Sequence, residues 1–313
     1  MRFPLQSNVL NVTAAKGNIR AGRLKKAANL LETAMRTLFT VCGFIAVGFV
    51  VIITVFLIIS GVPAIREIGL VDFLFGTRWA STAAEPSFGI LSFILTSVYG
   101  TFGAILIGVP IGILCAVFAA KYANGKAAAL TRGLVGLMSG IPSVVYGLIG
   151  MIIVVPAVRE IFALPDGANL FSAVIVLSIM ILPSVISVSE TALRAVPKEY
   201  EEASLALGAT KTETVFKVTL PAAKSGILAA VVLGIGRAVG EAMAVMMVAG
   251  NVPNMPGIFQ SVRFLTTAVA SEMSYSSGLQ RQALFSIAMV LFAFIMLINL
   301  TLNFVVKRSD KKK

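Results

Sequence analysis

The sequence predicts an all-α, polytopic membrane protein that crosses the bilayer six times and keeps both termini in the cytoplasm. Hydrophobic residues make up 58% of the 313 residues and charged residues only 13%, and the mean hydropathy is +0.94. This composition is too apolar for a soluble globular domain. Most apolar residues fall in runs that reach the roughly 20 residues a helix needs to cross a bilayer. Lys and Arg residues gather in alternate connecting segments, as they do in membrane proteins.

The chain is expected to begin with a cytoplasmic tail over residues 1–37. Its first 22 residues are polar and basic and are expected to have little regular structure. Leu24, Leu31 and Met35 then form an apolar stripe typical of an interfacial amphipathic helix. A transmembrane domain follows over residues 38–306, and residues 307–313 form a short basic cytoplasmic tail. The first span is too long and too far from the N-terminus for a cleaved signal peptide, which indicates a signal anchor. The six spans are predicted at residues 38–60, 91–119, 130–155, 170–190, 226–250 and 283–306.

The distribution of basic residues predicts the orientation of these spans. Of the 26 Lys and Arg residues, seven lie in the N-terminal tail, three in and just after the turn around Tyr122, five between the fourth and fifth spans, and five after the last. The segments on the other side of the membrane hold only five, and Arg237 lies within a span. Because basic loops stay in the cytoplasm, both termini and the segment between the fourth and fifth spans are expected to be cytoplasmic.

Composition also argues against several classes of function. The net charge of +12 forms no single patch and follows the topology instead, so it indicates membrane lipid rather than nucleic acid as the partner. The sequence contains no His, which excludes a histidine-ligated zinc site and a histidine proton relay. Cys42 and Cys115 lie inside apolar spans and are interpreted as packing residues. No nucleophile–base or metal constellation typical of an intramembrane enzyme is visible.

The cytoplasmic segment over residues 197–221 has the pattern of two short helices joined by a glycine. Acidic residues suit the first turn of a helix over 198–207, Gly208 suits the left-handed position after it, and Thr210 suits the cap of a second helix over 211–218. This elbow resembles the EAA loop of permease subunits in binding-protein-dependent ABC importers, which inserts into a cleft of the ATPase. An ordinary amphipathic loop is the alternative. The resemblance rests on Glu202, Ala203, Ser204, Gly208, Val218, Leu220 and Pro221, with Ser204 in place of Ala and Val218 in place of Ile.

A charged pair interrupts the predicted fifth span. Arg237 lies near the middle of residues 226–250, where an Arg costs about 2.5–3.5 kcal/mol on insertion scales. Glu241 follows one helical turn later, about 6 Å along the axis and on the same face. Two interpretations stay open. The two charges neutralise each other as a structural ion pair, or Arg237 contacts an anion in transit with its planar fork of donors while Glu241 holds it in place.

Prolines mark expected irregularities within the spans. Pro110, Pro142 and Pro183 are each expected to interrupt a span, and the backbone groups freed there must be satisfied inside protein or beside a cavity. Ser143 and Tyr146 follow Pro142 closely. They predict a hydroxyl-lined pathway suited to a hydrated oxyanion, although Ser and Tyr also serve as ordinary hydrogen-bonding residues between helices.

Glycines predict where helices approach one another. Gly-x-x-x-Gly pairs begin at Gly108, Gly136 and Gly236. Such pairs give smooth helix faces that favour close packing.

Three stretches narrow the family resemblance. GRAVGEAMAV from Gly236, IPSVVYGLIG from Ile141 and LTTAVASE from Leu265 are similar to C-type permease subunits of phosphate-specific transport (Pst) systems. The resemblance runs from the first span to Val306 and implies a type I ABC importer permease fold in a bacterial inner membrane. It also implies that Arg237 and Glu241 are a charged pair critical for transport.

The same resemblance implies a set of partners. These are a paired A-type permease subunit, two ATPase subunits and an external phosphate-binding protein, with inorganic phosphate as the substrate. The sequence has no G-x-x-x-x-G-K-[ST] loop, so the chain itself is not expected to hydrolyse ATP, and the partner ATPase is expected to bind ATP and Mg²⁺. Contact with the ATPase is implied for Glu202, Ala203, Gly208, Leu220 and Pro221.

Two outer segments, residues 61–90 and 251–282, are too long to be tight turns. They are expected either to form a landing surface for the soluble binding protein or merely to cap the helix ends. Within them, Trp79 suits the membrane interface, and a helix is predicted over 264–272.

Other transport functions stay open. A sulphate or molybdate permease of the same superfamily should lack the IPSVVYG and GRAVGE stretches. A secondary transporter should show inverted repeats and more membrane-embedded ionisable groups, and the sequence shows neither. Moving a dianion inward against 100 mV costs about 4.6 kcal/mol, so a chain without ion-coupling carboxylates needs an external source of energy.

Overall fold

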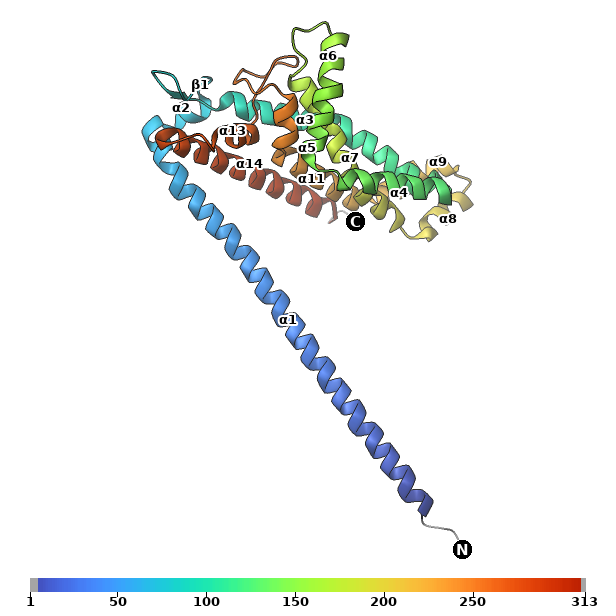
Figure 1. The fold of residues 1–313 in the computed structure, drawn as a ribbon. Helices are drawn as coiled ribbons and strands as arrows, with labels where there is room; N and C mark the ends of the chain where they lie inside the picture. The colour runs from blue at the N-terminus through green and yellow to red at the C-terminus, as the bar shows by residue number, and fades with distance from the viewer. Residues whose placement is uncertain (1–4, 311–313) are drawn as a thin grey trace. The chain divides into compact units, whose positions relative to one another are not determined.

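The computed structural model describes residues 5–310, and helices account for most of them (Figure 1). The chain divides into two units, residues 1–56 and 57–313. Where it is described, the first unit is one helix, the N-terminal part of α1 (Leu5–Ile68). From residue 31 onward the unit itself leaves the apolar side chains of this helix uncovered, as is typical of a single membrane-spanning helix.

The second unit holds the end of α1 and all later elements. β1 and β2 form a small antiparallel hairpin in which Trp79 lies opposite Phe88, and three short π-helical segments are labelled η. The elements are α2 (Leu70–Phe75), β1 (Trp79–Ala80), β2 (Ser87–Phe88), α3 (Leu91–Val117), η1 (Phe118–Tyr122), α4 (Gly125–Gly140), α5 (Ser143–Ile149), η2 (Gly150–Val154), α6 (Val155–Ile161), α7 (Leu170–Arg194), α8 (Lys198–Ala206), α9 (Lys211–Thr214), η3 (Val215–Thr219), α10 (Leu220–Ala222), α11 (Lys224–Gly240), α12 (Met243–Val248), α13 (Leu265–Glu272) and α14 (Gly278–Asp310).

The number of membrane spans agrees with the prediction when one bent pair of helices is counted as a span. The bent pair is Lys211–Ala222 with Lys224–Gly240, which meet at 71°. Five described helices are each long and apolar enough to cross a bilayer alone, namely Leu31–Ile68, Leu91–Tyr122, Ser143–Ile161, Leu170–Arg194 and Gly278–Thr301.

The predicted boundaries of the N-terminal and C-terminal tails do not coincide with breaks in the chain. α1 begins at Leu5 and runs for 64 residues, so the expected lack of structure is wrong over residues 5–22. The interfacial position of the segment before the first span stays a prediction. At the other end, α14 continues through residue 310, and residues 311–313 of the predicted tail lie outside the described residues.

The predicted third span, 130–155, is wrong at its start. α4 ends at Gly140 and α5 begins at Ser143, so α4 is a separate helix before the spanning segment. Pro142 explains the break, because it lacks an N–H and disfavours the helical conformation at Ile141, whose ψ is 125°. The predicted breaks at Pro110 and Pro183 are wrong, since both prolines lie inside the continuous helices α3 and α7.

The predicted fifth span, 226–250, is also interrupted. α11 ends at Gly240, and Glu241 takes an extended conformation (φ −73°, ψ 128°) before α12 begins at Met243. Arg237 lies in the last turn of α11. The expectation that Arg237 and Glu241 share one face of a continuous helix is therefore wrong.

Close packing of α3 against α7 forms the centre of the second unit. A Cβ atom placed at Gly108 would lie 2.7 Å from Cδ1 of Ile181, and one at Gly112 would lie 2.7 Å from Cγ1 of Val185. Real side chains do not tolerate such short separations, so the predicted close approach at Gly108 and Gly112 is confirmed. In Figure 1, α2 and β1 lie toward one end of α3, whereas α8 and α9 lie toward its other end.

The other two predicted glycine faces have no neighbour in the described part of the chain. A Cβ atom placed at Gly136, Gly140, Gly236 or Gly240 meets no other group within 4 Å. These glycines lie near the C-terminal ends of α4 and α11. Open glycine surfaces therefore precede both helix breaks.

Glu272 joins the two outer segments into one body. Its carboxylate accepts hydrogen bonds from Trp79 Nε1 (3.2 Å), Ser81 Oγ (3.2 Å) and Gln280 Nε2 (3.1 Å), and forms an ion pair with Arg263. Trp79 is buried against the rings of Phe88 and Phe93. Its indole is therefore part of the interior that joins these two segments. The predicted helix over 264–272 is present as α13.

The predicted orientation is testable with single cysteines in a variant that lacks Cys42 and Cys115. Asn124 and Thr212 are exposed on the predicted cytoplasmic side, and Tyr275, which is 90% exposed, lies on the predicted outer side. A membrane-impermeant maleimide added to intact spheroplasts is expected to label Tyr275→Cys only. Labelling of Asn124→Cys or Thr212→Cys before the membrane is opened would contradict the orientation.

Candidate functional site

Residues 197–221 form the predicted elbow, and its local signals are confirmed. α8 begins after Pro197, and Gly208 has a φ of 86°, the left-handed conformation expected after a helix. Thr210 Oγ1 accepts the N–H of Glu213 (3.3 Å), and Glu213 Oε2 accepts the N–H of Thr210 (3.1 Å). This reciprocal capping box fixes the start of α9.

The capping carboxylate of Glu213 stays ionised at neutral pH. The backbone N–H of Thr210, followed by the Lys217 ammonium and the Thr210 hydroxyl, lowers the pKa of Glu213 to about 2. A carboxyl with a depressed pKa stabilises the folded form in full above its ordinary pKa, and this contribution declines as the pH falls below that value toward about 2. The cap is therefore insensitive to physiological changes of pH.

One face of the elbow is exposed, and the other packs its two helices against each other. Glu202 and Ala203 are exposed, and Leu207 is 90% exposed. Ser204 turns inward instead, with its Oγ 2.9 Å from Oγ1 of Thr214 on α9. This hydrogen bond explains how a Ser fits the position where the family motif has Ala.

The two helix breaks lie beside each other in the second unit. α5, which follows the first break, packs on α12, which follows the second. A Cβ atom at Gly147 would lie only 2.8 Å from Cα of Ala244. The four predicted pathway residues lie at these breaks: Arg237 and Glu241 flank one, and Ser143 and Tyr146 follow the other.

Glu241 caps α12. Its Oε1 accepts the N–H of Ala244 at 3.0 Å, where the helix dipole also favours a negative charge. Its backbone carbonyl accepts a hydrogen bond from Thr266 Oγ1 on α13 at 2.7 Å. The side chain and the backbone of Glu241 thus both stabilise the break.

Arg237 belongs to none of the four ion pairs formed among the described residues. It is half-buried in the last turn of α11, where a cation is favoured by the helix dipole. Its charge interacts electrostatically with Tyr146 on α5. Among the described residues Arg237 thus has no carboxylate partner, and it lies just before the break between α11 and α12, which is suited to interaction with an anion.

The two predicted hydroxyl residues differ in their surroundings. Tyr146 is buried, and its hydroxyl donates to the carbonyl of Met138 at 2.8 Å, which bridges the break between α4 and α5. Ser143 is half-buried at the start of α5. Tyr146 therefore provides a second donor for the Met138 carbonyl, which also accepts the backbone N–H of Ile141 at the break.

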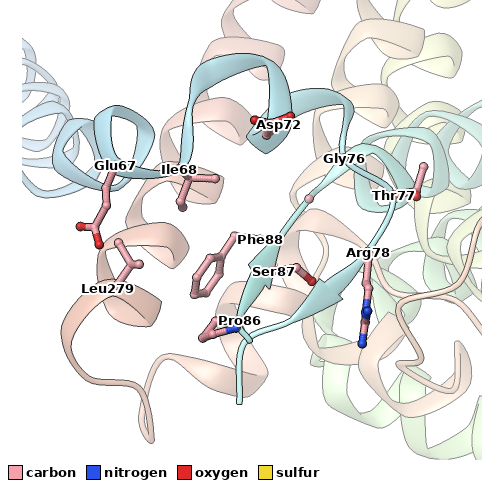
Figure 2. Close-up of a pocket in the computed structure, with 11 residues that line it drawn as sticks. Glu67, Ile68, Asp72, Gly76, Thr77, Arg78, Pro86, Ser87, Phe88 and Leu279 are labelled. Atoms are coloured by element: carbon pink, nitrogen blue, oxygen red, sulfur yellow. The ribbon is translucent and has the colours of Figure 1, made fainter. Parts of the chain in front are cut away.

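A separate hollow of about 510 Å³ lies between α2, the hairpin and the start of α14. Figure 2 shows that the side chains of Glu67 and Arg78 flank it from opposite sides, with Asp72 above Phe88. All of its walls except Leu279 come from the outer segment 61–90. It is lined by different residues from those at the helix breaks.

Comparison with known proteins agrees with these features. The family model of the inner membrane component of binding-protein-dependent transport systems matches residues 108–313. The chain belongs to this family. It is therefore an inner membrane transport component, and the EAA resemblance of the elbow is a resemblance within its own family.

Several named proteins are similar to this chain over most of its length. The probable ABC transporter permease protein YqgH of Bacillus subtilis is 37% identical over 277 residues, which cover 86% of this chain and 90% of that protein. The phosphate transport system permease protein PstC 2 of Mycobacterium tuberculosis is 30% identical over 290 residues, which cover 86% and 89%. PstC of Pasteurella multocida is 30% identical over 262 residues, which cover 77% and 81%.

Solved ABC importers show the same fold. A bacterial ABC transporter that imports the polysaccharide alginate matches with a TM-score of 0.55 at 15% identity, over 78% of this chain and 92% of that chain. The inward-facing MetNI methionine transporter matches with a TM-score of 0.53 at 22% identity, over 71% and 94%. The predicted type I ABC importer permease fold is confirmed.

Three polar residues that were not among the predicted site residues hold these features in place. Thr266 holds the carbonyl of Glu241, and the ion pair of Lys121 with Glu201 joins η1 to the elbow. Thr266 lies within the LTTAVASE stretch, so its hydroxyl was visible as a family signal. Lys121 and Glu201 are 80 residues apart, and no local pattern connects them.

Substitution at Gly208 tests the elbow of this family member. A Cβ atom at Gly208 meets no other group within 4 Å, so only the positive φ opposes a side chain. Gly208→Val is expected to cost roughly 1–2 kcal/mol locally and to reduce ATP hydrolysis stimulated by loaded binding protein. Gly208→Asn is the matched control, because Asn tolerates the left-handed conformation and should retain most stimulation. Equal, normal stimulation in both variants would remove the elbow conformation from the mechanism.

Proposed function

We propose that the chain is one of two permease subunits in an ATP-driven importer of inorganic phosphate. It forms half of the translocation pathway and couples to a separate ATPase through the elbow. The observation that carries this proposal is Arg237, an intramembrane cation that forms no ion pair in the described part of the chain and lies beside two adjacent helix breaks. Relatives named as phosphate transport permeases support phosphate as the substrate.

Open surfaces support a paired subunit and an ATPase. The glycine faces of α4 and α11, which precede the two breaks, have no neighbour in the described part of this chain. An A-type permease subunit facing them would enclose a pathway that contains Arg237. The exposed elbow residues Glu202, Ala203, Gly208 and Pro221, with half-buried Leu220, would contact one of two ATPase subunits.

The remaining parts of the proposed importer supply ATP hydrolysis and delivery of the substrate. ATP and Mg²⁺ are held by the ATPase, and this chain is a non-catalytic subunit without its own cofactor. An external phosphate-binding protein would dock on the outer body that Glu272 holds together. One rigid outer body suits this role better than two independent loops, because docking then orders little additional chain.

A permease for another oxyanion is the second candidate. The relative YqgH is named as a permease without a substrate, and an Arg fork also binds sulphate or molybdate. Radiolabelled phosphate uptake in a strain that lacks this gene decides between them. Restored uptake on complementation, inhibited by arsenate and not by sulphate, is expected. If phosphate uptake does not depend on the gene, or if sulphate inhibits it, the substrate would instead be another oxyanion.

The charge at Arg237 can be tested separately from Glu241. Arg237→Gln is expected to assemble normally, because it leaves no carboxylate unpaired, and to lower phosphate uptake at least about tenfold. A charge-assisted hydrogen bond is worth roughly 1.5–3 kcal/mol, and about 1.4 kcal/mol corresponds to tenfold in rate. Arg237→Lys should retain partial uptake, since it keeps the charge without the fork.

Glu241→Gln is the matched control for that series. Its amide oxygen still accepts the N–H of Ala244, so this variant should transport much better than Arg237→Gln. The double variant Arg237→Gln/Glu241→Gln should be as defective as Arg237→Gln alone. Near-normal uptake by the double variant would instead show that transport needs neither charge and would remove Arg237 from the pathway.

A further inference from the structure

We propose that η1, the π-helical end of α3, is a second mechanical attachment of the elbow, and that Lys121 and Glu201 position it. This inference rests on the proposed function, because it concerns how movement of the elbow reaches the membrane helices. Along the chain, the elbow is connected only to α7 before it and to α11 after it. η1 belongs to neither helix, so its contacts provide an additional route.

Glu201 is the centre of this attachment. It forms an ion pair with Lys121 of η1, and the two side chains are only 26% and 13% exposed. The same carboxylate oxygen accepts a hydrogen bond from Oγ1 of Thr219 at 3.1 Å, and Thr219 is fully buried. One carboxylate therefore joins η1, the first helix of the elbow and the segment that leads to α11.

Tyr122 makes a second, independent contact between η1 and the elbow. Its hydroxyl donates to Oγ1 of Thr212 at 3.3 Å. The ammonium of Lys211 lies 5.1 Å from the centre of its ring, within the range of a cation–π interaction. The two contacts fix η1 to both helices of the elbow, α8 and α9.

η1 is also anchored on its opposite side. Arg194 at the end of α7 donates from Nη2 to the carbonyl of Ala119 at 2.8 Å, and its Nε donates to Glu190 at 2.8 Å. A π-helical turn shifts backbone hydrogen bonding away from the ordinary helical pattern, and such turns occur frequently at functional sites. Arg194 and Lys121 thus hold η1 between the helix scaffold and the elbow.

Through this attachment, a displacement of the elbow would also act on α3. α3 packs along α7 through Gly108 and Gly112, so the pair resists movement of one helix without the other. A displacement of α8 would act on α3 through Lys121 as well as on α11 through Thr219. Such a contiguous set of polar contacts and packed helices can couple distant sites, and coupling has to be measured to be established.

The measurement is transport per ATP hydrolysed, in the complete complex with its ATPase and binding protein in proteoliposomes. Lys121→Gln and Glu201→Gln are expected to assemble and to hydrolyse ATP, with phosphate transported per ATP lowered about fivefold, the scale of losing one partly exposed ion pair. The charge reversal Lys121→Glu/Glu201→Lys is expected to restore the ratio. A role confined to folding would lower the yield of complex and leave the ratio unchanged.

Lys217→Gln is the matched control, because it removes an ion pair on the same elbow that is 74% and 46% exposed and does not reach η1. Its ratio should equal that of the wild type. If Lys121→Gln does not assemble, Tyr122→Phe carries the test, since it loses only the hydroxyl contact; a lowered ratio supports the attachment and an unchanged ratio overturns it. A wild-type complex without ATP-dependent phosphate uptake would refute the proposed function instead, and the ratio would then be measured with the oxyanion that is transported.

Discussion

The close approach of α3 to α7 is the contact on which the other features depend. Glycines on α3 allow the approach, and the same face continues to Gly100, where a Cβ atom would lie 2.4 Å from the ring of Phe264. Ser97 Oγ on α3 also accepts the N–H of Leu265 at 3.0 Å, which fixes the start of α13. α13 in turn supplies Thr266 to the carbonyl of Glu241. One helix face therefore positions the break beside Arg237, while the far end of the same helix contacts the elbow through η1.

Broken helices within a membrane require their free backbone groups to be satisfied by protein. Here the chain does this with its own side chains. The Tyr146 hydroxyl donates a hydrogen bond to the carbonyl of Met138. The Glu241 side chain caps α12, and the Glu241 carbonyl accepts a hydrogen bond from the Thr266 hydroxyl. These bonds stabilise the breaks without Arg237, and its guanidinium forms no ion pair within the described residues. In the proposed importer, an anion in transit would supply the partner that the described residues do not provide, which would offset the cost of placing an Arg in the membrane.

Local signals in the sequence predicted local structure well. Gly208 and Thr210 were assigned correctly because their roles depend only on backbone conformation and on an oxygen within the next turn. The prediction that Arg237 and Glu241 share a helix face was wrong because helical periodicity holds only while the helix continues. Here α11 ends at Gly240, and the Glu241 carboxylate caps the next helix, α12. Lys121 and Glu201 meet only after α3, α7 and the elbow have packed. The sequence shows both charges, but it contains no local pattern that predicts their contact across 80 positions.

The common dependence on α3 has a consequence for an importer without ion coupling. In the proposed importer, energy from ATP would enter at the elbow and the anion would be released near Arg237, so the two places would have to move in a fixed relation. A flexible elbow joined only through Pro197 and Ala223 would dissipate part of that movement in its connections. The attachment of η1 reduces this freedom with a partly buried ion pair, and the glycine packing of α3 on α7 extends the rigid body toward α13. In the proposed importer, the same rigid body would then determine both the position of the ATPase contact and the shape of the break that exposes Arg237.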